Sequence, residues 1–177
     1  LYEILTAFSF TPGVIEDIWK SLHSEPGKKF FSETHRLIKD REFLIIEAFK
    51  EIEERKYYIE SDQDRIFEPL SMKLEKVLQA DYVIPKSQGI GSFDFDLIDF
   101  PLIIRKWRAG DYFYPLGMNN PKKLSDFFID EKFSILQKEH TWLLCSGQDI
   151  VWVIGHRIDN RFKISEKTES ILKVSLV

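Results

Sequence analysis

The sequence WLLCSGQDIVWVI, residues 142–154, decides the fold of the C-terminal half of this chain. Two apolar runs, 142–145 and 150–154, flank the polar tetrapeptide at 146–149. Short runs rich in Val, Ile and Trp predict strands, and a polar tetrapeptide that contains glycine predicts a turn between them. We therefore expect a β-hairpin at this place.

The segments on either side of this hairpin predict a small unit of strands and helices. Leu124, Phe127 and Phe128 recur at helical spacing, whereas the segment around Pro115 and Gly117 is typical of a loop. The expected elements are a strand at 101–107, a turn at 108–111, a loop at 112–122, a helix at 123–132, a short helix at 134–139 and a closing strand at 171–177.

The N-terminal half predicts helices first and strands later. A helix is expected after Thr11, which can cap it, and Pro12, which suits its first position. Its apolar face combines residues at helical spacing, namely Val14, Ile15, Ile18, Trp19 and Leu22. The other expected elements are a helix at 1–8, paired strands at 34–38 and 42–46, short strands at 57–59 and 66–67, an element of either kind at 72–79 and a strand at 93–97.

These elements place the chain in the α+β class. N-terminal helices are followed by a strand meander, and a small α+β C-terminal domain with a mixed sheet and one or two helices closes the chain. Three segments are expected: a helical segment at 1–27, a strand-rich middle domain at 28–100 and a C-terminal domain at 101–177.

The composition excludes several classes of protein. Hydrophobic residues make up 44% and charged residues 31%, which indicates a globular chain rather than a disordered one. A single cysteine, Cys145, excludes a disulfide framework, so a cytoplasmic location is expected. No apolar run approaches the roughly 20 residues of a membrane span. Because Leu1 is neither an initiator methionine nor the start of a signal peptide, we expect a piece of a longer protein.

Charge is distributed unevenly along the chain. The formal net charge is -4, with -7 in residues 1–100 and +3 in residues 101–177. The most basic stretch, 101–127, sets five cations against Asp111 and Asp126; the cations are Arg105, Lys106, Arg108, Lys122 and Lys123. Such an excess is consistent with a phosphate-binding surface, and ordinary solvated charge explains it as well.

Most motifs that would carry catalysis are absent or incomplete. The four histidines include no pair at i, i+4, so no metal site is predicted. Residues 89–91 lack the third glycine of a dinucleotide-binding loop. Residues 146–149 lack the second glycine of the SGGxDS loop of ATP pyrophosphatases. Cys145 lies in an apolar run, where burial would raise its pKa rather than activate the thiol. We therefore expect no catalytic residue in this chain.

Two pairs of carboxylates leave a small hydrolase as an alternative. Asp94 and Asp96 would share one face of a strand, and Asp126 and Asp130 lie one helical turn apart. Paired acids can perform acid–base chemistry. The solvated side of a half-buried strand is the more ordinary explanation of the first pair.

The most unusual local stretch is RKWRAGD at 105–111. In a strand, Arg105 and Trp107 would share one face, and Lys106 and Arg108 the other. Such cations can neutralise phosphates, and an exposed indole can stack on a base. The alternative places Trp107 in the core and the cations in water, and the residues alone leave both open.

This stretch opens a series of motifs that resembles the C-terminal domain of bacterial tRNA(Ile)-lysidine synthetases. The series continues through PLGM at 115–118, KKLSDFFID at 122–130, WLL at 142–144, IVWVIG at 150–155 and RIDNRFK at 157–163. A weaker likeness, to the segment that follows the catalytic domain in Bacteroidetes-like members, is carried by GKKF at 27–30, HRL at 35–37 and DR at 40–41.

The resemblance implies a fold, an activity and a set of partners. The full-length enzyme would be a ligase that uses ATP to adenylate the wobble cytidine of the CAU-anticodon tRNA(Ile) and then attaches free lysine. ATP and Mg would act in an N-terminal domain that carries SGGxDS, a motif missing from this sequence. This chain is therefore expected to be inactive, to hold no cofactor and to contact no membrane. It is expected to bind tRNA(Ile) on the acceptor-stem side of the tRNA.

The expected RNA contacts are basic and aromatic, because A-form RNA presents mainly phosphates and 2′-hydroxyls. They are Arg105, Lys106, Trp107, Arg108, Lys122, Lys123, Arg157, Arg161 and Lys163, with Lys28, Lys29, His35 and Arg36 as weaker candidates. Lys122 and Lys123 also precede a helix whose N-terminus would attract phosphate. A protein–protein or dimerisation module, with a possible homodimer, is the alternative.

Overall fold

The computed structural model describes residues 1–49, 55–80 and 82–177. The chain divides into two compact units, one formed by residues 1–53 with 133–138 and the other by residues 54–132 with 139–177. This division differs from the expected three segments, because residues on both sides of the expected boundaries at 27 and 100 share one unit. Residues 50–54 and 81, which belong to the expected middle segment, lie outside the described residues.

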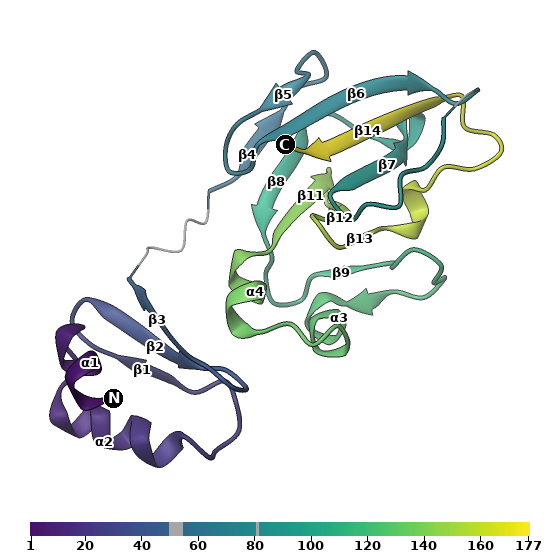
Figure 1. The fold of residues 1–177 in the computed structure, drawn as a ribbon. Helices are drawn as coiled ribbons and strands as arrows, with labels where there is room; N and C mark the ends of the chain where they lie inside the picture. Colours follow the sequence, from purple (N-terminus) through teal and green to yellow (C-terminus); the bar gives the residue numbers. More distant parts are fainter. Residues whose placement is uncertain (50–54, 81) are drawn as a thin grey trace. The chain divides into compact units, whose positions relative to one another are not determined.

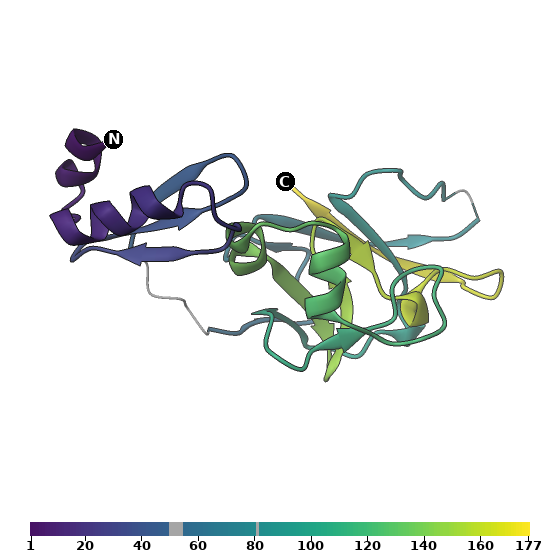
Figure 2. The ribbon, with the colours of Figure 1, turned by 90° about the horizontal axis from the view of Figure 1, so that it is seen from below.

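The first unit packs two helices on a three-stranded sheet. Figure 2 shows α2 running along one face of that sheet. Its buried cluster takes side chains from both layers, Leu5, Phe10, Ile15, Ile18 and Leu37. The helices and strands therefore share one core. The elements are α1 (Tyr2–Ala7), α2 (Pro12–Ser21), β1 (Lys29–Phe31), β2 (His35–Lys39) and β3 (Leu44–Ala48), with antiparallel strands in the order β1-β2-β3.

Helix α2 begins at Pro12, as the sequence predicts, but two details differ. Thr11 stands at the capping position and its side chain makes no capping hydrogen bond. Trp19, expected on the apolar face, is 63% exposed, whereas Ile15 and Ile18 are buried. Consecutive helical residues are about 100° apart, so burying Ile18 turns Trp19 toward solvent.

The second unit is built from two sheets, which Figure 1 shows one above the other. One sheet has the order β13-β12-β11-β8-β4, and its strands are β4 (Tyr57–Ile59), β8 (Leu102–Lys106), β11 (Trp142–Ser146), β12 (Asp149–Val153) and β13 (Arg157–Ile158). The other has the order β5-β6-β14-β7, with strands β5 (Arg65–Ile66), β6 (Met72–Leu78), β7 (Ile90–Asp94) and β14 (Ser170–Leu176).

The α+β class is confirmed, and the expected mixed sheet is not observed. Every pairing between the named strands of the described residues is antiparallel. Parallel neighbours need long crossover connections. Here β11 and β12 form the expected hairpin, whose turn is Gly147-Gln148, and β14 returns from the end of the chain to lie between β6 and β7.

Shorter elements complete the second unit. The expected loop at 112–122 contains a two-stranded pairing, since its two ends pair as β9 and β10. The expected strand at 93–97 stops at Asp94, because the Asp94 carboxylate accepts a hydrogen bond from the Asp96 backbone N–H and starts a helical turn. These elements are β9 (Tyr112–Phe113), β10 (Lys122–Lys123), α3 (Leu124–Asp130) and two short 3-10 helices, η1 (Phe95–Leu97) and η2 (Asn160–Phe162). Helix α4 (Ile135–His140) lies mostly in residues 133–138, which group with the first unit.

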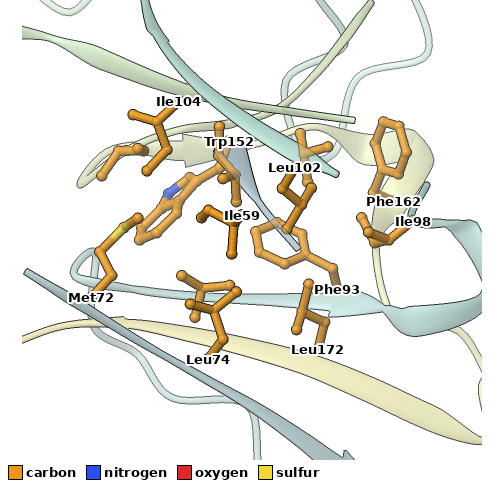
Figure 3. Close-up of a cluster of buried hydrophobic side chains, with 14 residues drawn as sticks. Ile59, Met72, Leu74, Phe93, Ile98, Leu102, Ile104, Trp152, Phe162 and Leu172 are labelled. Carbon is orange, nitrogen blue, oxygen red and sulfur yellow. The ribbon is translucent and has the colours of Figure 1, made fainter. Parts of the chain in front are cut away.

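The core of the second unit lies between its two sheets. Figure 3 shows side chains of both sheets meeting there, with Leu102, Ile104 and Trp152 on one side and Met72 and Leu74 on the other. Leu143, Leu144 and Cys145 are all buried although successive strand residues point to opposite faces, so both faces of β11 are covered. Figure 1 shows β9 and α3 on the face of this sheet that is turned away from β6 and β14. Cover on both faces explains why residues 142–145 are continuously apolar.

Gly91 offers a direct test of the packing in this core. A Cβ at Gly91 would lie 2.4 Å from Cζ of Phe93 and 3.2 Å from the Trp152 ring, and both rings are fully buried. Gly91→Ala should therefore lower the free energy of unfolding by about 1–3 kcal/mol, measured by urea denaturation. Gly89→Ala is the control, because its Cβ would meet nothing closer than 3.6 Å. Equal stability of the two variants would contradict this packing.

Candidate nucleic-acid interface

Arg105, expected to contact phosphate, is instead held by an acid. Its Nη1 and Nη2 atoms each donate to a different oxygen of Asp111 at 2.8 Å, and the two side chains are only 15% and 14% exposed. These hydrogen bonds raise the pKa of Arg105 above its ordinary value. Asp111 also accepts from the Arg108 backbone N–H at 2.7 Å. The pair therefore closes the turn between β8 and β9, and its charges neutralise each other.

Lys106 also points to a structural partner. Its Nζ donates to the backbone carbonyl of Glu139 at 2.8 Å and lies 4.0 Å from the centre of the Trp142 ring. Burial lowers the pKa of Lys106 to about 8. A cation over an indole is stabilised by the electrons of the ring, so this lysine fastens the end of β8 to the segment before β11.

Trp107 is half-buried, and its ring meets the Phe128 ring edge-on at a centroid distance of 5.2 Å. Phe128 is fully buried on α3. The indole is thus a packing contact between the turn after β8 and helix α3. Of the two alternatives left open by the sequence, the structure favours the packed tryptophan.

A smaller basic surface remains beside this turn, formed by Arg108, Tyr112 and Lys123, and we call it the hairpin patch. Lys123 pairs with Tyr112 across β9 and β10, and the Leu124 N–H donates to the Asp111 carbonyl at 2.8 Å. All three residues of the patch are exposed, Tyr112 by 53%. Arg108 and Lys123 have no side-chain partner in the described part of the chain. The patch can therefore offer two cations and an aromatic ring to a ligand.

Three of the remaining candidate cations are paired. Lys122 forms an ion pair with Asp130, and Arg157 lies 3.5 Å from Glu131. Arg161 donates to Asp159 at 2.9 Å and to Asp149 at 2.8 Å, and its guanidinium lies over the Tyr114 ring. Hydrogen bonds with Asp159 raise the pKa of Arg161 well above its ordinary value. Lys163, in contrast, is exposed and has no side-chain partner among the described residues.

The weaker candidates lie in the first unit. Arg36 on β2 forms an ion pair with Glu47 on β3, and the His35 Nδ1 atom lies 2.8 Å from the Thr34 hydroxyl. Lys28 and Lys29 are exposed. Within this unit, Arg36 therefore has a partner in the neighbouring strand.

Comparisons with known proteins identify the family of this chain. The family model described as the TilS substrate binding domain matches residues 1–51, and the one described as the TilS substrate C-terminal domain matches residues 102–175. The chain belongs to the tRNA(Ile)-lysidine synthase family. Its division into two units places each matched region in a different unit, apart from residues 133–138.

Curated relatives in this family match along the whole chain. This chain is 47% identical to the tRNA(Ile)-lysidine synthase of Parabacteroides distasonis, and the match covers 100% of this chain and 41% of the relative. It is 41% identical to that of Bacteroides thetaiotaomicron, over 100% of this chain and 39% of the relative. The chain thus spans about two fifths of these relatives. A solved TilS C-terminal domain has a similar fold, with a TM-score of 0.57 at 19% identity, covering 68% of this chain and 95% of that one.

For this family member, sequence reasoning missed the aromatic part of the patch. Tyr112, Phe113 and Tyr114 alternate in burial, with Phe113 fully buried and Tyr112 exposed. The rings of Tyr112 and Tyr114 lie 6.4 Å apart at a steep angle. Three consecutive aromatic residues favour a strand, but the surrounding Pro and Gly residues indicate a loop.

The other candidate sites do not assemble. Asp94 is buried and its carboxylate is bonded to Thr168, whereas Asp96 is exposed on the next turn, so the two acids are not an open pair. Burial raises the pKa of the Cys145 thiol to about 11. In the described ranges, no three His, Cys, Asp or Glu residues are grouped so that they could hold a metal ion. The described helices include none with the length and hydrophobicity of a bilayer span.

Proposed function

We propose that this chain is the tRNA-recognition portion of a tRNA(Ile)-lysidine synthase. The family models described as substrate binding and C-terminal domains support this proposal, because together they match most of the chain. The hairpin patch is the observation that carries it in structural terms. Its two unpaired cations lie beside an exposed tyrosine in the matched C-terminal region of the described residues.

The chemistry of the hairpin patch suits folded RNA. An A-form stem has a deep, narrow major groove, so proteins contact its phosphates and 2′-hydroxyls. Arg108 and Lys123 can neutralise phosphates, and the Tyr112 hydroxyl can hydrogen-bond to a ribose. In this proposal, Arg105, Lys106 and Trp107 contact no RNA and instead hold the turn that presents Arg108.

The reaction itself belongs, in this proposal, to the longer protein. ATP would adenylate the wobble cytidine of the CAU-anticodon tRNA(Ile), and free lysine would displace AMP to give lysidine. This sequence holds no SGGxDS loop to bind ATP, so ATP and Mg would act in another domain and this chain alone would be inactive. A cytoplasmic location follows from a tRNA substrate.

Binding of tRNA(Ile) by the 177-residue chain tests the proposal. The double variant Arg108→Ala/Lys123→Ala should lower the affinity by about tenfold or more at roughly 0.1 M salt. The slope of log K against log salt should also become shallower by about 0.9 for each phosphate that the variant no longer neutralises. Fluorescence anisotropy over a salt series measures both quantities.

The control is Lys56→Ala/Arg65→Ala, which removes the same amount of charge. Lys56 lies just before β4 and Arg65 lies on β5, and both are exposed. The control should bind tRNA nearly as well as the parent chain. An equal loss in both double variants would contradict the hairpin patch and show a diffuse charge effect. A stable dimer that does not bind tRNA, seen by sedimentation, would favour the alternative of a dimerisation module.

A further inference from the structure

A second basic surface lies away from the hairpin patch, in a cleft of the second unit. The cleft has a volume of about 290 Å³. Residues 84–88, which precede β7, line it together with residues 156–158 around β13 and residues 163–164 after η2. Trp152, in the core of the unit, contributes to its wall. It is therefore a depression next to the core, bordered by the loop before β7.

Basic side chains outnumber acidic ones among the residues that line this cleft. Lys86, Arg157 and Lys163 line it, and none of the described lining residues is Asp or Glu. Lys86 and Lys163 have no ion-pair partner in the described ranges. Arg157 is 3.5 Å from Glu131, with both side chains nearly half exposed, so this pair is weak. The charge of the cleft therefore complements an anion.

The inner wall of the cleft suits a flat apolar body with polar edges. Ile84, Ile158 and Trp152 supply apolar surface. Ser92 is buried with its hydroxyl 2.7 Å from that of Tyr82, and Gln88 adds an amide. His156 is half-buried at the edge of the cleft, and burial lowers its pKa. Such a lining matches a nucleobase better than a bare phosphate.

We propose that this cleft takes one unpaired nucleotide of a bound RNA, with its phosphate beside Lys86 and Lys163 and its base against the apolar wall. The inference rests on the proposed function. It adds to the hairpin patch a second contact with the RNA, made to a base as well as to a phosphate. The volume lies just below the usual range for small-molecule pockets, about 300–1,000 Å³, so the cleft suits one nucleotide rather than a duplex. Proteins recognise unpaired nucleotides by this combination of stacking and edge hydrogen bonds.

A short labelled single-stranded RNA, free of secondary structure, is the direct probe of the cleft. The variant Lys86→Ala/Lys163→Ala should weaken its binding to the 177-residue chain by about fivefold or more. The salt slope should become shallower by about 0.7 for each phosphate that is no longer neutralised. Lys56→Ala/Arg65→Ala again removes equal charge elsewhere and should bind as the parent does. Equal losses in the two double variants would overturn the proposal.

A charge placed inside the cleft provides a second test that does not depend on removing cations. Gln88→Glu has nearly the same shape as the parent residue but adds a negative charge, so it should weaken binding of the oligonucleotide. Gln88→Leu adds no charge and should weaken binding less than Gln88→Glu does. AMP should compete with the oligonucleotide more strongly than inorganic phosphate does, because only AMP carries a base. Equal competition by phosphate, or tighter binding of an acidic peptide, would refute a nucleotide site.

Failure of this inference can be separated from failure of the proposed function. If tRNA binding depends on Arg108 and Lys123 while Lys86→Ala/Lys163→Ala binds both tRNA and oligonucleotide normally, the cleft proposal is wrong and the proposed function stands. If the parent chain binds no RNA, both are wrong. Trimming the unpaired 3′ end from tRNA should remove the effect of the cleft variant if that end supplies the nucleotide, and leave it unchanged if a loop does.

Discussion

Asp159→Ala is expected to lower the free energy of unfolding of the second unit by about 3 kcal/mol, because it removes a fully buried carboxylate that accepts several hydrogen bonds. The Asp159 side chain is 0% exposed. Its two oxygens accept from the Tyr114 N–H at 2.9 Å and from the Arg161 N–H, Nε and Nη2 at 2.8, 3.0 and 2.9 Å. One carboxylate thus joins the segment after β9 to η2.

The substitution would leave donors unsatisfied in a place that water reaches poorly. The Tyr114 N–H would lose its acceptor, and Arg161 would keep its exposed bond to Asp149 and its contacts with the Tyr114 and Phe162 rings. An unsatisfied buried donor costs about 1–3 kcal/mol by itself. Urea denaturation followed by tryptophan fluorescence measures the loss of stability.

Asp149→Ala is the matched control for this prediction. Asp149 also pairs with Arg161, but its side chain is about half exposed, so its removal should cost no more than about 1 kcal/mol. If the two alanine variants were equally stable, the buried network would not be the main link between β9 and η2.

The second large effect is expected at the turn after β8. Asp111→Ala should lower the free energy of unfolding by about 3–5 kcal/mol, because Arg105 would keep its charge in a poorly solvated place without its bidentate partner. The Arg108 N–H would also lose its acceptor. Thermal or urea unfolding of the parent and the variant measures this difference.

A double variant distinguishes a structural Arg105 from one that contacts RNA. Arg105→Met/Asp111→Asn removes both charges and keeps a side-chain acceptor for the Arg108 N–H. Replacing a buried ion pair by uncharged side chains is often nearly neutral, so most of the stability lost in Asp111→Ala should return. The double-mutant cycle should show a coupling energy of about 1–3 kcal/mol.

The same double variant should bind tRNA as well as the parent chain does, since the proposal assigns no RNA contact to Arg105. A stable, folded double variant that has lost tRNA binding would contradict this assignment and return Arg105 to the interface. A double variant as unstable as Asp111→Ala would contradict the pairwise explanation of the turn.

Local sequence patterns predicted much of the fold because they act over short distances. The apolar runs at 142–145 and 150–154 form the hairpin β11–β12, and the strands at 35–39 and 44–48 pair as the meander predicts. The helix at 124–130 follows its apolar spacing. Such signals depend on the period of side chains along a helix or strand, which a sequence displays directly.

The tertiary structure alone decided which cations face solvent. Five cations between 101 and 127 look alike in sequence, yet Arg105 reaches Asp111, Lys106 reaches Trp142 and Lys122 reaches Asp130. Arg108 and Lys123 are left in the hairpin patch, and Lys86 and Lys163, which are far apart in sequence, line one cleft. The sequence determines which residues carry a charge. Whether that charge is neutralised depends on partners that only folding brings within a few ångströms.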